Sequence, residues 1–117
     1  MPHVTMRWRA TPEVPRSEVK KLAQALPEIC APALSVPGGR QYSPAGIVVK
    51  VDRQSDMDVN MPPIMIEVFV TGTEEQMNRR DDANNQIIEG IISCLGNNVV
   101  GQGSVWVLLP PTSFGLL

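Results

Sequence analysis

The sequence has few of the residues that build metal centres, disulfide frameworks and nucleic-acid surfaces. Its 117 residues include two cysteines and one histidine, too few for a disulfide framework or a His/Cys zinc site. The formal net charge of -2 gives no basic footprint for nucleic acid or anionic lipid. Every apolar run is far shorter than the roughly 20 residues of a membrane-spanning helix. We therefore expect no metal, no other cofactor, no nucleic-acid partner and no membrane.

The cysteines also bear on the compartment. Cys30 and Cys94 lie among apolar residues at helical spacing and are expected to be buried thiols. No basic segment followed by an apolar segment is found near the N-terminus, so no secretory signal is expected. Unpaired thiols fit a reducing compartment, and the cytoplasm is predicted.

Aromatic residues are also scarce, whereas proline is abundant. Aromatic residues make up 4% of the chain, and there are 11 prolines, nearly twice the usual share of about 5%. The length fits one domain over residues 1–117, and the composition is that of a globular protein. Nearly all prolines lie between expected helices and strands. Pro2 differs, because it directly follows Met1.

The first half of the chain predicts a strand, a helix and a second strand. Residues 3–9 alternate, with Val4, Met6 and Trp8 on one face and Arg7 and Arg9 on the other, which is typical of a half-buried strand. From Ser17, apolar residues recur at helical spacing. Pro27 is expected to kink or end this helix, with a further turn before Pro32. Residues 46–52 are rich in β-branched side chains and predict the second strand.

The second half predicts the same order. Residues 64–70 are almost all apolar, as in a strand covered on both faces. Thr73 and Gln76 form a capping box, and the helix that follows is expected to continue to Leu95 and stop at Gly96. Residues 104–109 predict a fourth strand, and residues 112–117 a short edge hairpin.

Two βαβ units, of about residues 1–61 and 62–117, predict an α/β (α+β) fold. Right-handed crossovers give a four-stranded mixed sheet with both helices on one face. Arg7 and Arg9 are expected on the other face, opposite Glu67 or Asp52. A sheet face that is half apolar and half charged usually packs on something, so we expect an oligomer.

A Met-Pro start that runs directly into a strand, in a chain of two βαβ units, resembles the tautomerase superfamily. The likeness is to its two-unit members, the macrophage migration inhibitory factor and 5-carboxymethyl-2-hydroxymuconate isomerase branches. It is strongest at Met1-Pro2-His3, at the turn over residues 70–76, and at residues 105–109 leading to Phe114. The resemblance implies a catalytic proline, exposed when Met1 is removed, a homotrimer packed through its sheet faces, and a small carbonyl or enol substrate.

The chemistry explains why such a proline must be terminal. The nitrogen of an internal proline is a tertiary amide, whereas a terminal proline is a secondary amine. An α-amino group titrates near 7.7–8.0, and an apolar pocket lowers its pKa further. Pro2 would then be a general base for keto–enol proton transfer on a 2-oxo acid or related enol. The resemblance therefore implies an isomerase.

The resemblance also suggests residues that bind the substrate. Arg40 follows a Gly-Gly loop, where some relatives carry a substrate-binding lysine, and Lys50 is a second candidate for the carboxylate. Tyr42 could donate to an oxyanion. Trp106 and Phe114 could form the apolar wall around Pro2.

Two departures point away from the diacid substrates of the short relatives. Their helix-start arginine is replaced by the acidic turn of residues 72–75, and Trp106 stands where they carry a second arginine. A monoacid, an uncharged enol, or little or no activity all remain open.

Two alternatives to an active tautomerase fit the same pattern. One is a non-catalytic small-molecule-binding or interaction module of ferredoxin-like type, which shares the element order. The other is a catalytically silent protein with the tautomerase fold. Removal of Met1 discriminates between them and the enzyme, because Pro2 is an amide while Met1 is in place.

Overall fold

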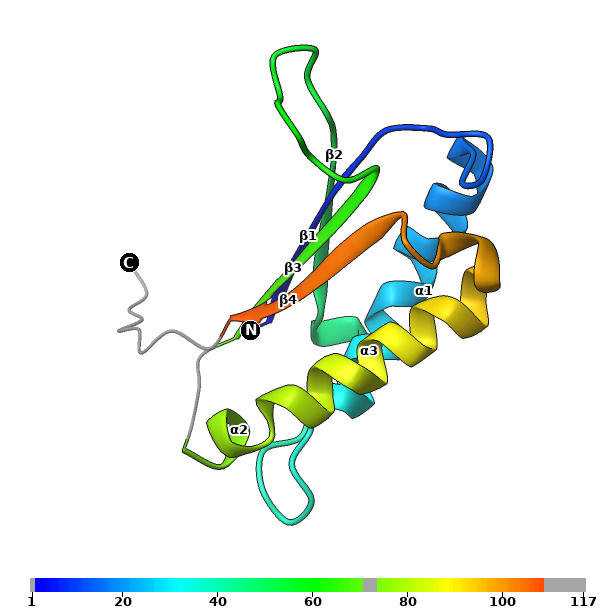
Figure 1. Ribbon diagram of the computed structural model, residues 1–117. Helices are drawn as coiled ribbons and strands as arrows, with labels where there is room; N and C mark the ends of the chain where they lie inside the picture. The colour runs from blue at the N-terminus through cyan, green and yellow to red at the C-terminus, as the bar shows by residue number, and fades with distance from the viewer. Residues whose placement is uncertain (1, 71–73, 109–117) are drawn as a thin grey trace.

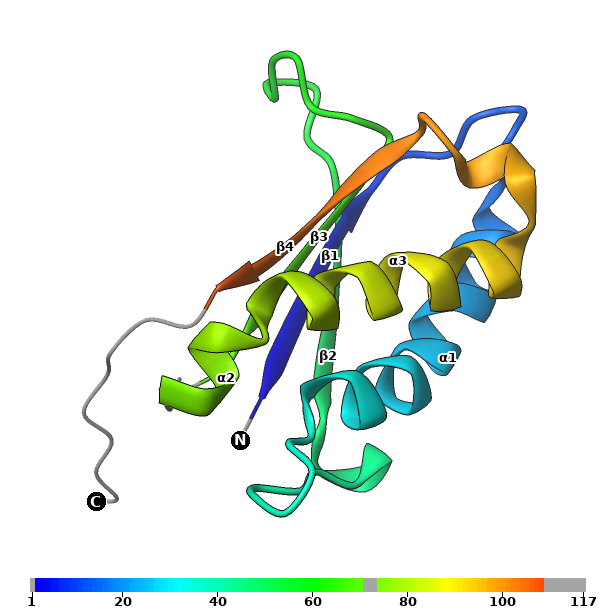
Figure 2. The same cartoon turned by 60° about the horizontal axis from the view of Figure 1, so that its bottom comes forward.

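The computed structural model describes residues 2–70 and 74–108. They form a four-stranded sheet in the order β2-β1-β3-β4, whose helices cover one face (Figures 1 and 2). The strands are β1 (His3–Trp8), β2 (Val48–Arg53), β3 (Ile64–Phe69) and β4 (Gly103–Leu108). The helices are α1 (Arg16–Leu34), α2 (Glu74–Asn78) and α3 (Arg80–Leu95), with 3-10 turns η1 (Pro44–Gly46) and η2 (Asn97–Val99). The predicted α+β fold is confirmed.

The two βαβ halves run in opposite directions along the sheet. β1 pairs with β2 in parallel and with β3 in antiparallel orientation, and β3 pairs with β4 in parallel. At one end of the sheet, the Val48 N–H donates to the Pro2 carbonyl at 3.2 Å. At the other end, the Arg9 N–H donates to the Pro63 carbonyl at 2.9 Å. Pro2 and Pro63 therefore lie at opposite ends of the sheet.

The core lies between the sheet and the helices. Alternate residues of the central strands point into it, as period-two patterning requires. Val4 and Met6 of β1 are buried there beside Ile66 and Val68 of β3. Val19, Leu22 and Leu26 of α1, and Ile87 and Ile91 of α3, complete the core from the helix side. No helix within the described ranges combines the length and hydrophobicity needed to cross a bilayer.

The first helix corrects a prediction. α1 runs through both Pro27 and Pro32 to Leu34, so the expectation that the helix could end at Pro27 is wrong. An interior proline removes one backbone hydrogen bond and costs about 3 kcal/mol. Each large aliphatic side chain that α1 buries returns about 1.5–3 kcal/mol, and four of them are buried: Val19, Leu22, Leu26 and Leu34. Burial along the whole helix therefore outweighs the two prolines.

The second helix is divided, whereas one continuous helix was expected. α2 ends at Asn78, and Arg79 adopts φ -105° and ψ 9° before α3 begins. The Arg79 N–H bonds to the Gln76 carbonyl at 3.1 Å, a tighter turn than an α-helix makes. The predicted end of the helix is confirmed, because Gly96 follows Leu95 with φ +82°. The break changes the direction in which Arg79 and the residues after it project.

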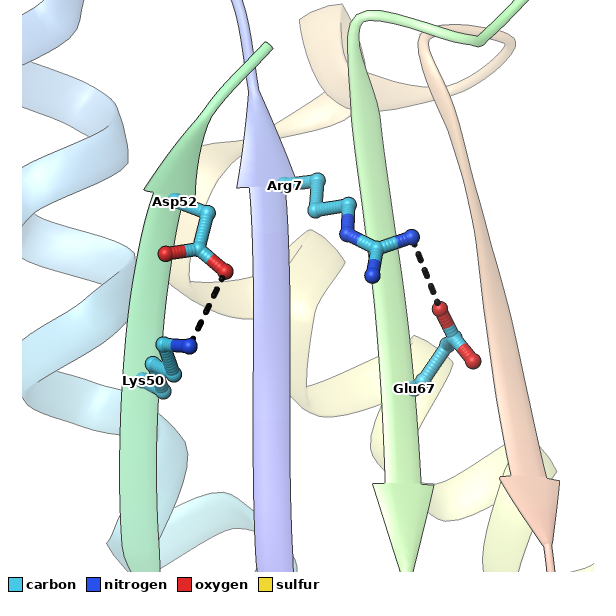
Figure 3. A network of polar contacts seen from close by, with 4 residues as sticks. All are labelled: Arg7, Lys50, Asp52 and Glu67. Carbon is cyan, nitrogen blue, oxygen red and sulfur yellow. Dashed lines mark ion pairs between the residues drawn. The ribbon is translucent and has the colours of Figure 1, made fainter.

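The face opposite the helices, here called the open face, carries charged pairs among apolar side chains. Arg7 lies 3.7 Å from Glu67, and Lys50 lies 3.7 Å from Asp52 (Figure 3). The pairing expected between Arg7 and Glu67 is confirmed. Arg9 differs, because its guanidinium donates to the Met61 carbonyl at 3.0 Å rather than to a neighbouring carboxylate.

Candidate functional site

Pro2 is buried at the end of the sheet where β3 and β4 finish. Its side chain is less than 2% exposed, and it continues the helix-facing alternation of Val4 and Met6. Because His3 pairs with Phe69, Pro2 lies opposite Val70, which is 4% exposed. Ile47, which precedes β2, is 7% exposed. The surroundings of Pro2 are therefore apolar, as a desolvated amine would need.

The loop between α1 and β2 is held at this same end of the sheet. The Ser35 hydroxyl donates to the Ala31 carbonyl at 2.7 Å and accepts the Tyr42 N–H at 2.9 Å. The Val36 N–H bonds to the Arg40 carbonyl at 2.9 Å. Gly38 adopts φ +72°, a conformation that favours glycine. Hydrogen bonds thus fix the loop that carries Arg40 and Tyr42.

A side-chain hydrogen bond joins this loop to the second half of the chain. Gln76 of α2 donates from Nε2 to the Tyr42 hydroxyl at 3.0 Å, and its side chain is buried. The capping box predicted for Gln76 involves Thr73, which lies outside the described residues. The Tyr42 contact spans 34 residues, so no local pattern could have indicated it. The Tyr42 oxygen accepts this hydrogen bond, and its own O–H remains a donor.

Three arginines lie around this end of the sheet. The Arg40 guanidinium lies 5.4 Å from the centroid of the Tyr42 ring, within cation–π range. Arg79, which is half-buried, and Arg80 line a narrow hollow with Val70 and Gln76. No ion pair joins any of the three arginines to a carboxylate of the described residues.

Arg79 and Arg80 were missed by the sequence analysis. The resemblance led us to expect an arginine at the start of this helix, where residues 72–75 form an acidic turn. The cations instead follow one turn later, at the break between α2 and α3. The adjacent arginines were visible in the sequence, but the direction set by the helix break was not.

The remaining candidates are not gathered around Pro2. Lys50 lies on the open face, paired with Asp52. Trp106 pairs in register with Glu67 on the same face and is 54% exposed. Phe114 and the expected hairpin of residues 112–117 lie outside the described residues. Of the predicted binding residues, Arg40 and Tyr42 lie at the Pro2 end of the sheet.

The described residues offer little other chemistry. Within residues 2–70 and 74–108, no group of three or more His, Cys, Asp or Glu side chains is placed to hold a metal ion. Burial raises the pKa of the Cys30 thiol to about 12, so this cysteine is protonated at neutral pH and is a poor nucleophile.

No family model and no curated protein matches the sequence, but solved structures match its fold. A wild-type fused 4-OT, an asymmetric trimer, has a TM-score of 0.64 at 14% identity, covering 97% of this chain and 91% of that chain. Leishmania major MIF2 has 0.57 at 12%, covering 98% and 93%. Pt0534, inactivated by 2-oxo-3-pentynoate, has 0.51 at 15%, covering 92% and 82%. The chain has the fold of the tautomerase superfamily.

Proposed function

We propose that this protein is a tautomerase whose general base is the amine of Pro2, exposed when Met1 is removed. The observation that carries the proposal is the burial of Pro2 at the start of β1, in a chain with the tautomerase-superfamily fold. Removal of Met1 would convert the Pro2 nitrogen from an amide into an amine at this buried, apolar position.

The apolar surroundings supply the physical reason for activity at neutral pH. Desolvation disfavours the ammonium form and lowers the pKa of an amine, here through Val70 and Ile47, both nearly fully buried. Starting from about 7.7–8.0 for a free α-amine, the Pro2 nitrogen would be neutral near pH 7. It takes the proton of an enol hydroxyl and returns it to the α-carbon as the carbonyl forms.

The substrate we propose is a 2-oxo acid or a related enol. Arg40 and Arg79, which have no carboxylate partner among the described residues, would bind a carboxylate through charge-assisted hydrogen bonds. The Tyr42 hydroxyl, held by Gln76, would donate to the substrate oxygen on which negative charge develops. Phe114 is kept as a candidate for the apolar wall.

We further propose a homotrimer and a cytoplasmic protein. The fused 4-OT with this fold is a trimer, and the open face of this chain exposes apolar side chains that an assembly would cover. Lys50 and Trp106 are assigned to this assembly surface rather than to the substrate. The free thiols of Cys30 and Cys94 fit a reducing compartment.

The test combines intact mass with an assay of ketonisation. Protein from its native source should have lost Met1, and it should accelerate ketonisation of the enol of a simple 2-oxo acid. Pro2→Ala should lower kcat/KM at least about tenfold, since it loses the ring that fixes the nitrogen, and protein that retains Met1 should be inactive. Pro63→Ala is the matched control and should keep the wild-type rate, because the Pro63 nitrogen is an amide.

A covalent probe tests the amine without relying on turnover. An amine adds across the activated alkyne of 2-oxo-3-pentynoate, forming one N–C bond, and its proton goes to carbon with no leaving group. The protein mass should rise by the whole reagent, at Pro2. Equal ketonisation rates for wild type and Pro2→Ala, or Met1 retained in nearly all native molecules, would contradict the mechanism and favour a binding role.

A further inference from the structure

The second half of the chain repeats, at the far end of the sheet, the construction that surrounds Pro2. α1 leads through η1 into β2, and α3 leads through η2 into β4. Because β1 and β3 are antiparallel, the starts of β3 and β4 lie at the end remote from Pro2 (Figure 1). Pro63 takes the corresponding place there, with an amide nitrogen. This counterpart of the Pro2 site therefore has no base.

The counterpart contains a cavity of about 230 Å³, here called the α3–η2 pocket, between α3, η2 and the starts of β3 and β4. Ile88 and Val100 lie at its exposed rim, 36% and 60% exposed. Its walls are mostly aliphatic and include Ile64, Ile66, Ile91, Ile92, Val99 and Val105. The pocket is separate from the hollow that Arg79 lines.

Gly103 lines the β4 side of this space without contributing a side chain. It pairs in register with Ile64, and a Cβ at Gly103 would lie 2.3 Å from the Ile64 carbonyl oxygen. The position therefore accepts no side chain. Trp8, Ile64 and Gly103 lie side by side across β1, β3 and β4. The β4 member of this row has no side chain, and a space remains beneath α3 and η2.

The outer edge of β4 leaves the backbone polar groups of two lining residues, Gly103 and Val105, without a strand partner in the described part of the chain. The Ile64 N–H donates to the Gln102 carbonyl at 3.0 Å, so in a regular parallel ladder the backbone groups of Gly103 and Val105 point away from β3. Within the described residues, no strand pairs with this edge of β4. A ligand in the pocket could therefore form a hydrogen bond with the Val105 backbone.

We propose that the α3–η2 pocket binds a small uncharged aliphatic molecule with at most one hydrogen-bonding group. None of its lining residues is ionisable, in contrast to the Pro2 end, where Arg40 and Arg79 lie. Burying a charge against such walls is strongly unfavourable. A dry apolar cavity of about 150 Å³ accepts benzene, so about 230 Å³ suits a chain of roughly six to eight carbons. The proposal does not depend on catalysis by Pro2.

The probe is n-hexanol, added to the full-length protein with ¹³C-labelled isoleucine and valine methyl groups. Saturable NMR shifts are expected at Ile92, Val99 and Val105, and not at Val4 or Val68. Hexanoate and hexylamine at pH 7 should bind at least about tenfold more weakly than hexanol, because each would bury its charge. Pro2→Ala should bind hexanol like the wild type, which separates this site from the proposed function.

Filling the pocket from its rim gives the matched variants. Val100→Trp and Ile88→Trp change partly exposed side chains, so the fold should tolerate both, and each should weaken hexanol binding at least about tenfold by excluding volume. Gln24→Trp, on the exposed side of α1, is the control and should leave binding unchanged.

Four outcomes would overturn the proposal: no saturable binding, equal affinity for hexanoate, shifts outside the pocket, or unchanged affinity in both rim variants. A fifth would assign the pocket to a second copy of the chain. Met57 and Val59, on the loop between β2 and β3, are 88% and 78% exposed and are apolar enough to enter it. If a second copy fills the pocket, hexanol should bind only when the protein is dilute. The Met57→Asp variant, which could not enter the pocket, should then bind hexanol at high protein concentration as well.

Discussion

The Tyr42 hydroxyl shows how one hydrogen bond sets what a side chain can do. A phenol has one proton to donate and lone pairs that accept. Gln76 Nε2 donates to this oxygen at 3.0 Å, which leaves the Tyr42 proton to be directed elsewhere. Arg40 lies over the same ring at 5.4 Å. The contact of the ring with Arg40 and the proposed donor role of the hydroxyl can therefore be tested separately.

Tyr42→Phe removes the donor and keeps the ring beneath Arg40. If Tyr42 stabilises the developing oxyanion, kcat for ketonisation should fall about tenfold to a hundredfold with KM little changed. Gln76→Glu is the companion variant. A carboxylate at this position would accept a hydrogen bond from the Tyr42 hydroxyl, so the O–H would no longer point to the substrate and kcat should fall although the hydroxyl is still present. Thermal unfolding of both variants checks the fold, and a wild-type kcat in Tyr42→Phe would exclude the role.

Cys30 predicts a dependence of stability on alkaline pH. Burial raises the pKa of its thiol from 9.0 to about 12, and its side chain is fully buried. Below pH 9 both the folded and the unfolded chain hold the proton. Between pH 9 and 12 the unfolded chain releases it first, so the free energy of unfolding falls as pH rises, by up to about 4 kcal/mol over the whole interval.

Urea unfolding at pH 8 to 11 measures this slope. Cys30→Ala should be less stable at pH 8, because it leaves a cavity, but its stability should fall less steeply with pH. Cys94→Ala, at a partly exposed position, is the control and should keep the wild-type slope. If the free energy of unfolding falls equally steeply with pH in the wild type and in Cys30→Ala, burial of the thiol is not the cause of the lower stability at alkaline pH.

At the scale of helices and strands, the strands could be predicted closely from the sequence. The alternation that begins at His3 reports directly which side chains face the core, and β1 buries Val4 and Met6 accordingly. α1 could not be bounded in the same way. Pro27 and Pro32 are local signals for an ending, whereas the burial that extends the helix to Leu34 depends on the sheet beneath it.

The candidate site was predictable to a smaller extent. Pro2 is marked by its place in the chain, and Arg40 and Tyr42 by the loop before β2. The contact of Tyr42 with Gln76 is long-range, and the direction of Arg79 depends on a break in the helix that no proline or glycine marks. Trp106 was considered for the wall around Pro2, yet its register with Glu67 sets it on the open face. Such relations arise only when the two halves pack together.

At the scale of the whole molecule, the sheet divides the protein into a covered side and an uncovered one. The helices bury one face, while the open face leaves Trp106, Phe69 and Val48 exposed by 54%, 37% and 40%. The ion pairs of Figure 3 lie among them. An exposed face of this composition is typical of an interface between copies. The proposed homotrimer would cover it.

Trp106→Glu tests this assignment. In a monomer the change should have little effect on folding, because Trp106 is largely exposed. In a trimer packed through the open face, it would bury a carboxylate beside Glu67, at a cost of several kcal/mol, and the assembly should dissociate at concentrations at least about a hundredfold higher than for the wild type. Analytical ultracentrifugation should give three copies for the wild type and one for the variant at the same concentration.

Gln24→Glu, on the exposed side of α1, adds a negative charge elsewhere and should remain assembled. A wild type that sediments as a monomer would exclude the trimer, and a Trp106→Glu trimer as stable as the wild type would place the interface on another surface.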